Sequence, residues 1–188
     1  MTLFEYLSVA FSIVLSLGAA GLLRALRAVF MSRRRYWVHA TWVVAILFSH
    51  ALAWWSLWSY SEVEHWDLLS FLMVLIQPGT LYLVASLLVG DAISTETRWY
   101  DHYFRVRVWF FSARAVYIAA IIAGSWLVLG IPLLHPSRAF GAFGIALSII
   151  GISSSTDRVH AVLAILNLLA ILATAFALYI EPIRWGAA

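Results

Sequence analysis

Cysteine and lysine are both absent from this sequence of 188 residues. Without cysteine, the chain has no disulfide bonds, no thiolate metal ligands and no cysteine nucleophile. Without lysine, it cannot form a Schiff base with a carbonyl substrate or with retinal. The twelve basic residues are therefore all arginines.

Charged residues of any kind are scarce. They make up 11% of the chain, against about 25% in an average soluble domain, and 64% of the residues are hydrophobic. No hydrophilic stretch is long enough to form a second domain, so residues 1–188 are expected to form a single integral membrane domain. The net charge of +3 comes from arginines near the ends of apolar runs, which is not the pattern of a nucleic-acid-binding patch.

Six apolar segments are expected to cross a lipid bilayer as helices, because about 20 apolar residues in a helix span its hydrocarbon core. The clearest is 37–60, which contains no Asp, Glu or Arg and holds five of the ten tryptophans. The sequence thus predicts an all-α, polytopic transmembrane helical bundle. The expected spans are about 3–30, 37–60, 68–89, 113–131, 139–153 and 159–180.

The arginines predict the orientation, since basic residues near the ends of spans stay on the cytoplasmic side. Six spans with both termini outside place most of them inside: Arg24, Arg27, Arg33, Arg34, Arg35, Arg98, Arg105, Arg107, Arg114 and Arg158. Residues 90–114 mix aromatic and charged side chains, which is typical of an interfacial helix, here between spans three and four. Use of arginine without lysine, with many alanines, suggests a GC-rich bacterial genome and therefore the bacterial cytoplasmic (inner) membrane.

Polar side chains are expected near the bilayer midplane in every span. Such groups are costly in lipid unless they are paired inside the bundle. They allow two interpretations, ordinary hydrogen bonds between helices or the lining of a polar cavity or pore. His50 would be the ionisable gate or proton carrier, with Gln77 and Asn167 as polar coordinators. The full set is Ser16, His50, Gln77, Ser125, Ser148 and Asn167.

Pro78 stands at the midpoint of the third span, directly after Gln77. Proline removes a backbone hydrogen bond and clashes with the preceding turn, so a helix break is expected there. Broken helices line the binding sites of many transporters.

Two further sets of residues could hold a metal or a cofactor. His39 and His160 each begin a span on the inner side, and two facing histidines can ligate haem b. The outer loop 61–67 has weaker metal-ligand candidates without a standard spacing: Glu62, Glu64, His65 and Asp67. The sequence requires no cofactor.

The function expected from these patterns is a channel or transporter for an ion, a proton or a small polar solute. The protein is expected to form a homo-oligomer or to belong to a larger membrane complex. A non-catalytic subunit or assembly partner of such a complex is an alternative function that suits the small-residue stripes and the tryptophans. A haem b redox subunit is a second alternative. Enzyme activity is not favoured, because the chain has no His-Glu-x-x-His run and no Gly-x-Ser-x-Gly elbow.

Overall fold

The computed structural model describes residues 2–90 and 98–179, and every regular element in these ranges is a helix. The elements in chain order are α1 (Leu3–Met31), α2 (Trp37–Leu57), the short 3-10 helix η1 (Trp58–Tyr60), α3 (Leu68–Val89), α4 (Trp99–Leu127), α5 (Arg138–Ser153) and α6 (Asp157–Tyr179). The prediction of an all-helical chain is confirmed for the part that the structure describes.

Five of the described helical segments are long and apolar enough to cross a membrane, namely α1, α2 with η1, α3, α4 and α6. The sixth helix, α5, has 16 residues. At about 1.5 Å per residue it is roughly 24 Å long, which is shorter than a hydrocarbon core of about 30 Å. The chain therefore has the helices of a membrane protein, as its composition indicated.

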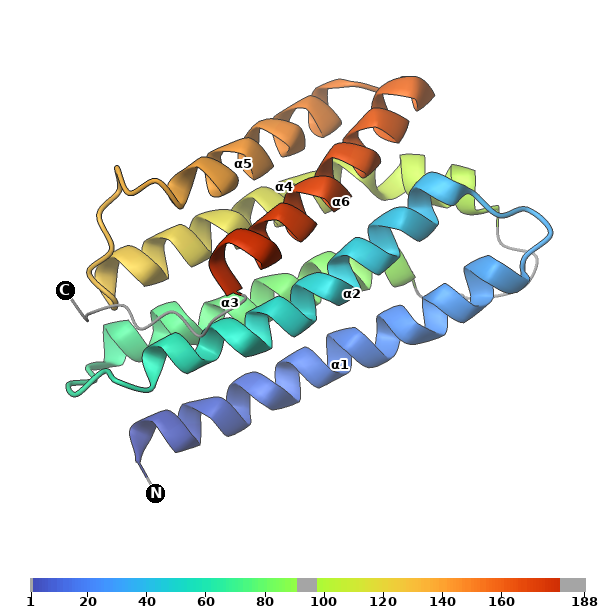
Figure 1. The fold of residues 1–188 in the computed structure, drawn as a ribbon. Helices are drawn as coiled ribbons and strands as arrows, with labels where there is room; N and C mark the ends of the chain where they lie inside the picture. The colour runs from blue at the N-terminus through green and yellow to red at the C-terminus, as the bar shows by residue number, and fades with distance from the viewer. Residues whose placement is uncertain (1, 91–97, 180–188) are drawn as a thin grey trace.

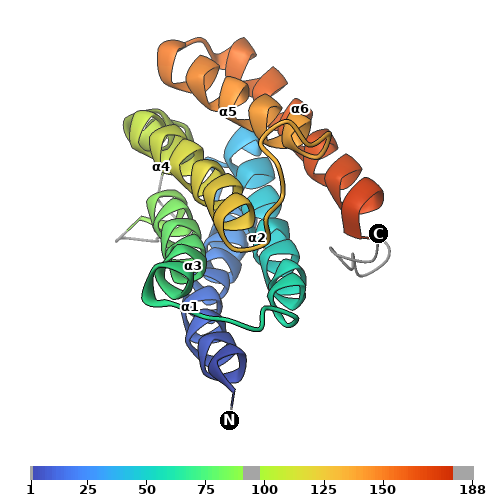
Figure 2. The ribbon, with the colours of Figure 1, turned by 90° about the vertical axis from the view of Figure 1, so that its left-hand side faces the viewer.

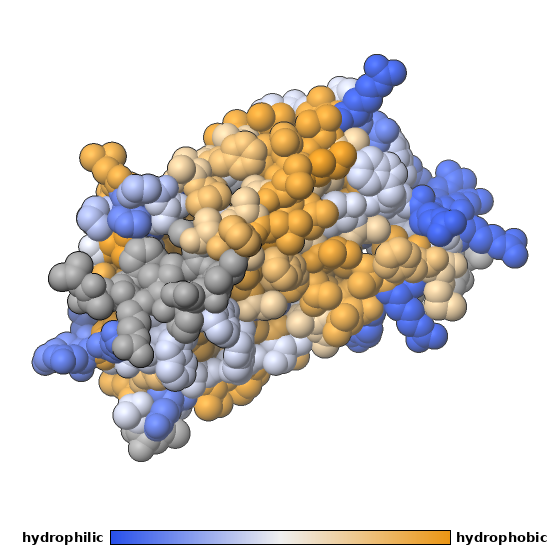
Figure 3. Space-filling model, in the orientation of Figure 1, coloured by the Kyte–Doolittle hydropathy of each residue, from blue (hydrophilic) through white to orange (hydrophobic). Residues whose placement is uncertain are grey.

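Successive helices run in opposite directions along the long axis of the bundle, with α6 inclined to the others (Figure 1). The connections 61–67 and 128–137 lie at one end, together with the N-terminus, and the connections 32–36 and 154–156 lie at the other. The face of the molecule drawn in Figure 3 has an apolar band across its middle and hydrophilic residues towards both ends. This distribution is what a helical bundle in a bilayer requires.

The helices pack in an order that leaves α2 and α4 mostly apart. α1 packs against α2 and α3, and α4 packs between α3 and α5. The last helix, α6, closes the arrangement by packing against both α2 and α5 (Figure 2). The backbones of α2 and α4 approach each other at few positions. Trp42 of α2 contacts the rings of Phe110 and Phe111 on α4, and α5 and α6 cover the remaining space between the two helices.

Two helices differ from the sequence prediction. The fourth span was expected at 113–131, after a separate interfacial helix, but α4 begins at Trp99 and runs without interruption to Leu127. Charged side chains do not interrupt the backbone hydrogen bonds of a helix, so the charged stretch and the apolar stretch form one element. Part of the expected interfacial segment, residues 91–97, lies outside the described residues.

Pro78, where a helix break was expected, lies inside α3, and the helix is not divided there. Proline removes one backbone donor but leaves the rest of the helical ladder in place. The hydroxyl of Thr80 lies in the same turn and donates to the carbonyls of Ile76 (2.9 Å) and Gln77 (3.0 Å).

Candidate functional site

A cavity of about 240 Å³ occupies the space that α5 and α6 cover between α2 and α4. It extends from the 128–137 connection to the middle of α4 and α6, where Arg114 and Asn167 line it. Isoleucine dominates its apolar wall. No Asp or Glu is found among the described residues that line it. Its polar lining comes from several helices: Ser49, Ser56, Ser59, Tyr60, Gln77, Arg114, Tyr117, Ser125, Ser137, Arg138, Asn167 and Thr174.

Arg114 joins three helices at the deep end of this cavity. One guanidinium nitrogen donates to the Gly144 carbonyl and to the Ser148 hydroxyl, both at 2.6 Å. The other donates to the Asn167 side-chain oxygen. The guanidinium carbon also lies 5.4 Å from the ring centroid of Trp42, a cation–π contact. These partners are all neutral, although the side chain is only 7% exposed and arginine remains charged in proteins.

The hydrogen bond from Arg114 fixes the orientation of the Asn167 amide group. Since a guanidinium can only donate, the atom facing Arg114 must be the amide oxygen, and the amide nitrogen points elsewhere. This nitrogen is buried and has no hydrogen-bond partner among the described residues. The residue is 1% exposed, so an unsatisfied donor lies beside the buried cation.

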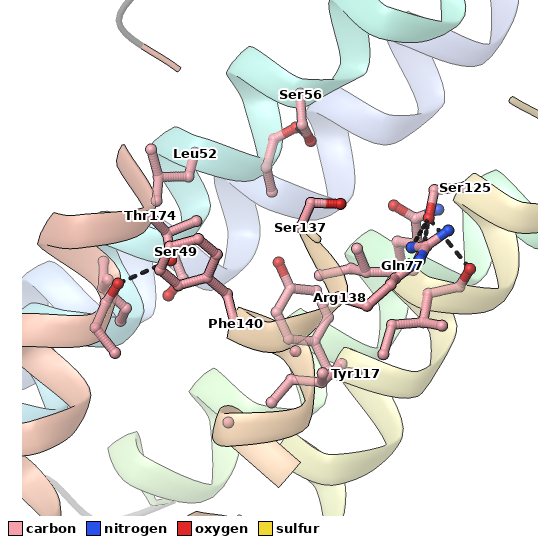
Figure 4. A pocket seen from close by; sticks show the side chains of 18 of the residues that line it. Ser49, Leu52, Ser56, Gln77, Tyr117, Ser125, Ser137, Arg138, Phe140 and Thr174 are labelled. Atoms are coloured by element: carbon pink, nitrogen blue, oxygen red, sulfur yellow. Dashed lines mark hydrogen bonds between the residues drawn. The ribbon is translucent and has the colours of Figure 1, made fainter. Parts of the chain in front are cut away.

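A second arginine lies where the cavity meets the 128–137 connection. Arg138 begins α5 and donates to the Ser125 hydroxyl at 2.6 Å and to the Ile131 carbonyl at 2.8 Å. Gln77 donates to the Tyr60 hydroxyl at 3.1 Å. Figure 4 shows Gln77, Ser125 and Arg138 on the same side of the cavity. The cavity therefore has one guanidinium near a bundle end and another near the bundle centre.

The structure brings together four of the six polar residues expected at the midplane. Gln77, Ser125 and Asn167 line the cavity, and Ser148 contacts it through Arg114. All four are buried.

The other two members of that set lie elsewhere. Ser16 is exposed, and its hydroxyl donates at 2.8 Å to the Ser12 carbonyl of its own helix. His50 is buried, but its ring packs against α1, where a Cβ on Gly18 would come within 2.4 Å of Nε2. Its Nδ1 donates to the Ile46 carbonyl at 2.8 Å, because a carbonyl only accepts. His50 is not part of the cavity lining, so the site has no histidine at the position where a gate was expected.

The two candidate haem ligands, His39 and His160, lie in an aromatic cluster near the 32–36 end. Tyr103 contacts both rings, with centroid distances of 6.2 Å to His39 and 5.3 Å to His160. Both nitrogens of His160 are engaged, with the Tyr103 hydroxyl and the Ser154 carbonyl, each at 2.9 Å. His39 stacks on Trp99. Tyr103 thus contacts both candidate ligands, whereas neither nitrogen of His39 has a hydrogen-bond partner in the described structure.

The outer-loop candidates Glu62, Glu64, His65 and Asp67 are not grouped around one point in the described structure. In the described ranges, no three His, Asp or Glu side chains are grouped so that they could hold an ion. Asp67 instead caps α3 by accepting from the Ser70 backbone N–H at 2.7 Å. This hydrogen bond holds the pKa of the Asp67 carboxyl below its usual value.

Neither of the two arginines was expected from the sequence to be a site residue. Arg114 was grouped only with the inner basic residues, and Arg138 was given no role. The available signal was that Arg114 is followed by an uncharged stretch that extends past Ser125. A long apolar helix would therefore draw this charge into the bundle rather than leave it at a surface.

Comparison with known proteins adds no assignment to this geometry: the chain matches no protein-family model, no curated protein and no solved structure.

Proposed function

We propose that this protein transports or conducts a small solute across a bacterial inner membrane and that the solute occupies the cavity between α2, α4, α5 and α6. The observation that carries this proposal is a cavity that reaches from one end of the bundle to the level of Arg114 and Asn167. Ligand sites commonly lie between the helices of a bundle, with apolar walls and a few convergent polar groups. Substrate sites of secondary transporters lie near the bilayer midplane.

The proposal includes a topology. All six helices cross the bilayer, with α5 crossing as a short span packed against α4. The 32–36 end, which carries Arg33, Arg34 and Arg35, faces the cytoplasm. The N-terminus and the 61–67 connection then face outwards, and the cavity approaches the outer side. The first turns of α4 lie near the inner surface. The C-terminal residues 180–188, which lie outside the described part, are proposed to be on the outer side.

A flux assay in proteoliposomes tests this function. The full-length protein is reconstituted and uptake is measured for a panel of inorganic cations, inorganic anions, organic carboxylates and neutral polar solutes. We expect the wild type to carry at least one of these classes faster than protein-free vesicles. Absence of flux for every class would contradict the proposal.

Substitutions at two neighbouring positions of α6 test whether the solute passes through this cavity. Ala170 lines the cavity, whereas Leu169 is 57% exposed on the outside of the bundle. Ala170→Trp should fill the cavity and abolish most of the flux, and Leu169→Trp should leave it unchanged. Equal flux in both variants would place the path elsewhere.

A further inference from the structure

We propose that the ligand of this cavity is a small organic anion, in which one carboxylate is carried on an apolar body. The inference rests on the proposed function, because it names the class of solute that the same site takes. Three properties of the described residues support it: the sign of the charge, the excess of hydrogen-bond donors, and the apolar wall.

The charge in the cavity is positive and uncompensated. Arg114 and Arg138 both line it, and no carboxylate is present on the described part of its wall. Every protein group that bonds to Arg114 is neutral. A buried cation is costly unless it is paired, and a bound anion would supply the missing partner. A cationic ligand would have to enter a site that already holds two positive charges.

The unused hydrogen-bonding groups around Arg114 are donors. A guanidinium has five N–H groups, and Arg114 uses three of them for Gly144, Ser148 and Asn167. The amide nitrogen of Asn167 supplies further N–H groups without a partner in the described structure. Donors on two adjacent side chains can be satisfied together by a carboxylate, which only accepts.

The apolar wall of the cavity fits an organic anion better than a bare inorganic ion. Isoleucine and leucine side chains on α2, α4 and α6 line the cavity beside the polar groups: Ile46, Leu52, Ile118, Ile121, Ile122 and Ile171. A small inorganic anion would lose its hydration without filling this apolar space. A carboxylate with a hydrocarbon or aromatic body would fill it and bury apolar surface in return.

Binding to the purified full-length protein tests this class of ligand. Thermal unfolding in detergent is followed with sodium benzoate, hexanoate or oleate, and with two controls, sodium chloride and benzamide. Benzamide matches benzoate in shape but has no charge. We expect at least one carboxylate to raise Tm in a saturable manner, since a ligand that binds only the folded state stabilises it, whereas benzamide and chloride do not.

The carboxylate that works identifies the source of the ligand. Stabilisation by benzoate or hexanoate indicates a small soluble carboxylate, and stabilisation by oleate alone indicates a fatty acid taken from the bilayer. If none of the three carboxylates stabilises the protein more than chloride and benzamide do, the inference is wrong. Stabilisation by chloride alone would also overturn it, in favour of an inorganic anion.

One isosteric substitution separates a ligand site from a purely structural bridge. Asn167→Asp places a carboxylate beside Arg114 and should keep the fold, because the new side chain can accept the same hydrogen bond. The fixed carboxylate should take the place of the ligand's carboxylate and weaken benzoate binding by about tenfold or more, the effect of losing a charge-assisted hydrogen bond. The exposed Arg27 serves as a control, and Arg27→Gln should retain the wild-type response. If the Asn167→Asp variant binds benzoate as tightly as the wild type does, the carboxylate does not bind beside Arg114 and Asn167.

The two proposals fail in different ways. Carboxylate binding that requires Asn167, without flux of any solute, would refute transport and leave the ligand class standing. Flux of a cation or a neutral solute that Ala170→Trp blocks, without carboxylate binding, would refute the ligand class and leave transport standing.

Discussion

Serine and threonine hydroxyls of the first three helices and the two cavity arginines of the last three are hydrogen-bonded in different ways. In α1 and α3, Ser16 and Thr80 donate to carbonyls of their own helix, and in α2 His50 does the same. In the second half of the chain, Arg114 bonds across to α5 and α6, and Arg138 bonds across to α4. Two larger polar side chains of the first half also bond beyond their own turn: Gln77 donates to the Tyr60 hydroxyl, and Tyr36 donates to the Asp157 carboxylate of α6.

The difference shows that a polar residue near the centre of an apolar helix can have either of two roles. A hydroxyl or imidazole that bonds to its own helix needs no neighbour, so it does not fix how helices pack. A guanidinium is too large and has too many donors to be satisfied by one helix. It therefore ties several helices together, and in this chain it does so beside a cavity.

The largest expected effect comes from comparing Asn167→Leu with Ser16→Ala. The first removes the acceptor of a charge-assisted hydrogen bond and leaves an Arg114 donor buried without a partner, so we expect a loss of about 2–3 kcal/mol of stability. The second removes a bond within one exposed turn and should change stability by less than about 0.5 kcal/mol. Denaturant or thermal unfolding in detergent measures both. Similar losses in the two variants would remove the distinction between the halves.

A smaller effect is expected where α5 meets α4. A Cβ on Gly151 would come within 2.6 Å of the buried Phe111 ring, whereas a Cβ on Gly79 in α3 would meet no atom within 4 Å. Overpacking should make Gly151→Ala about 1–2 kcal/mol less stable. Gly79→Ala should be neutral or stabilising, because alanine favours helix more than glycine does. A neutral Gly151→Ala would show that α5 can move away from α4.

The cap of α3 should give a pH-dependent effect. Because the Ser70 N–H lowers the pKa of Asp67, the charged carboxylate is favoured in the folded state. Its contribution is fully present above the unfolded pKa, near 3.8, and is lost as the pH falls through the lower folded pKa. Asp67→Asn should keep the cap and lose this acid dependence, whereas Asp67→Ala should slightly lower Tm at neutral pH. Parallel acid-unfolding curves for the wild type and Asp67→Asn would contradict the assignment.

A small effect is also expected at His50. Its Nε2 is buried without a hydrogen-bond partner in the described structure, and its Nδ1 bonds only within α2. Replacing it by leucine exchanges an unsatisfied polar group for an apolar one of similar size and should change stability by less than about 1 kcal/mol. The flux in proteoliposomes, and its dependence on pH, should stay at wild-type values. If the flux depends on pH in the wild type but not in His50→Leu, the result would support His50 as the gate.

The sequence predicted the helices well where hydropathy alone defines them. The span 68–89 coincides with α3, and 37–60 coincides with α2 and η1. It failed at α4, where the charged residues 99–112 were assigned to a separate element. Hydropathy reports the solvent around a helix, whereas the length of a helix depends on its backbone hydrogen bonds, and those continue through charged residues.

Composition and hydropathy by themselves determined that this protein is an all-helical bundle with several helices able to cross a membrane, because too few charged residues exist to cover a surface in water. They also indicated Gln77, Ser125, Ser148 and Asn167 as buried polar residues, since apolar helices must turn such groups inwards. Only the tertiary structure decided that Ser16 faces outwards, that His50 packs on α1, and that Arg114 connects α4 to α5 and α6. The physical reason is that periodicity places a side chain on one face of its own helix, whereas packing alone sets which neighbour that face meets.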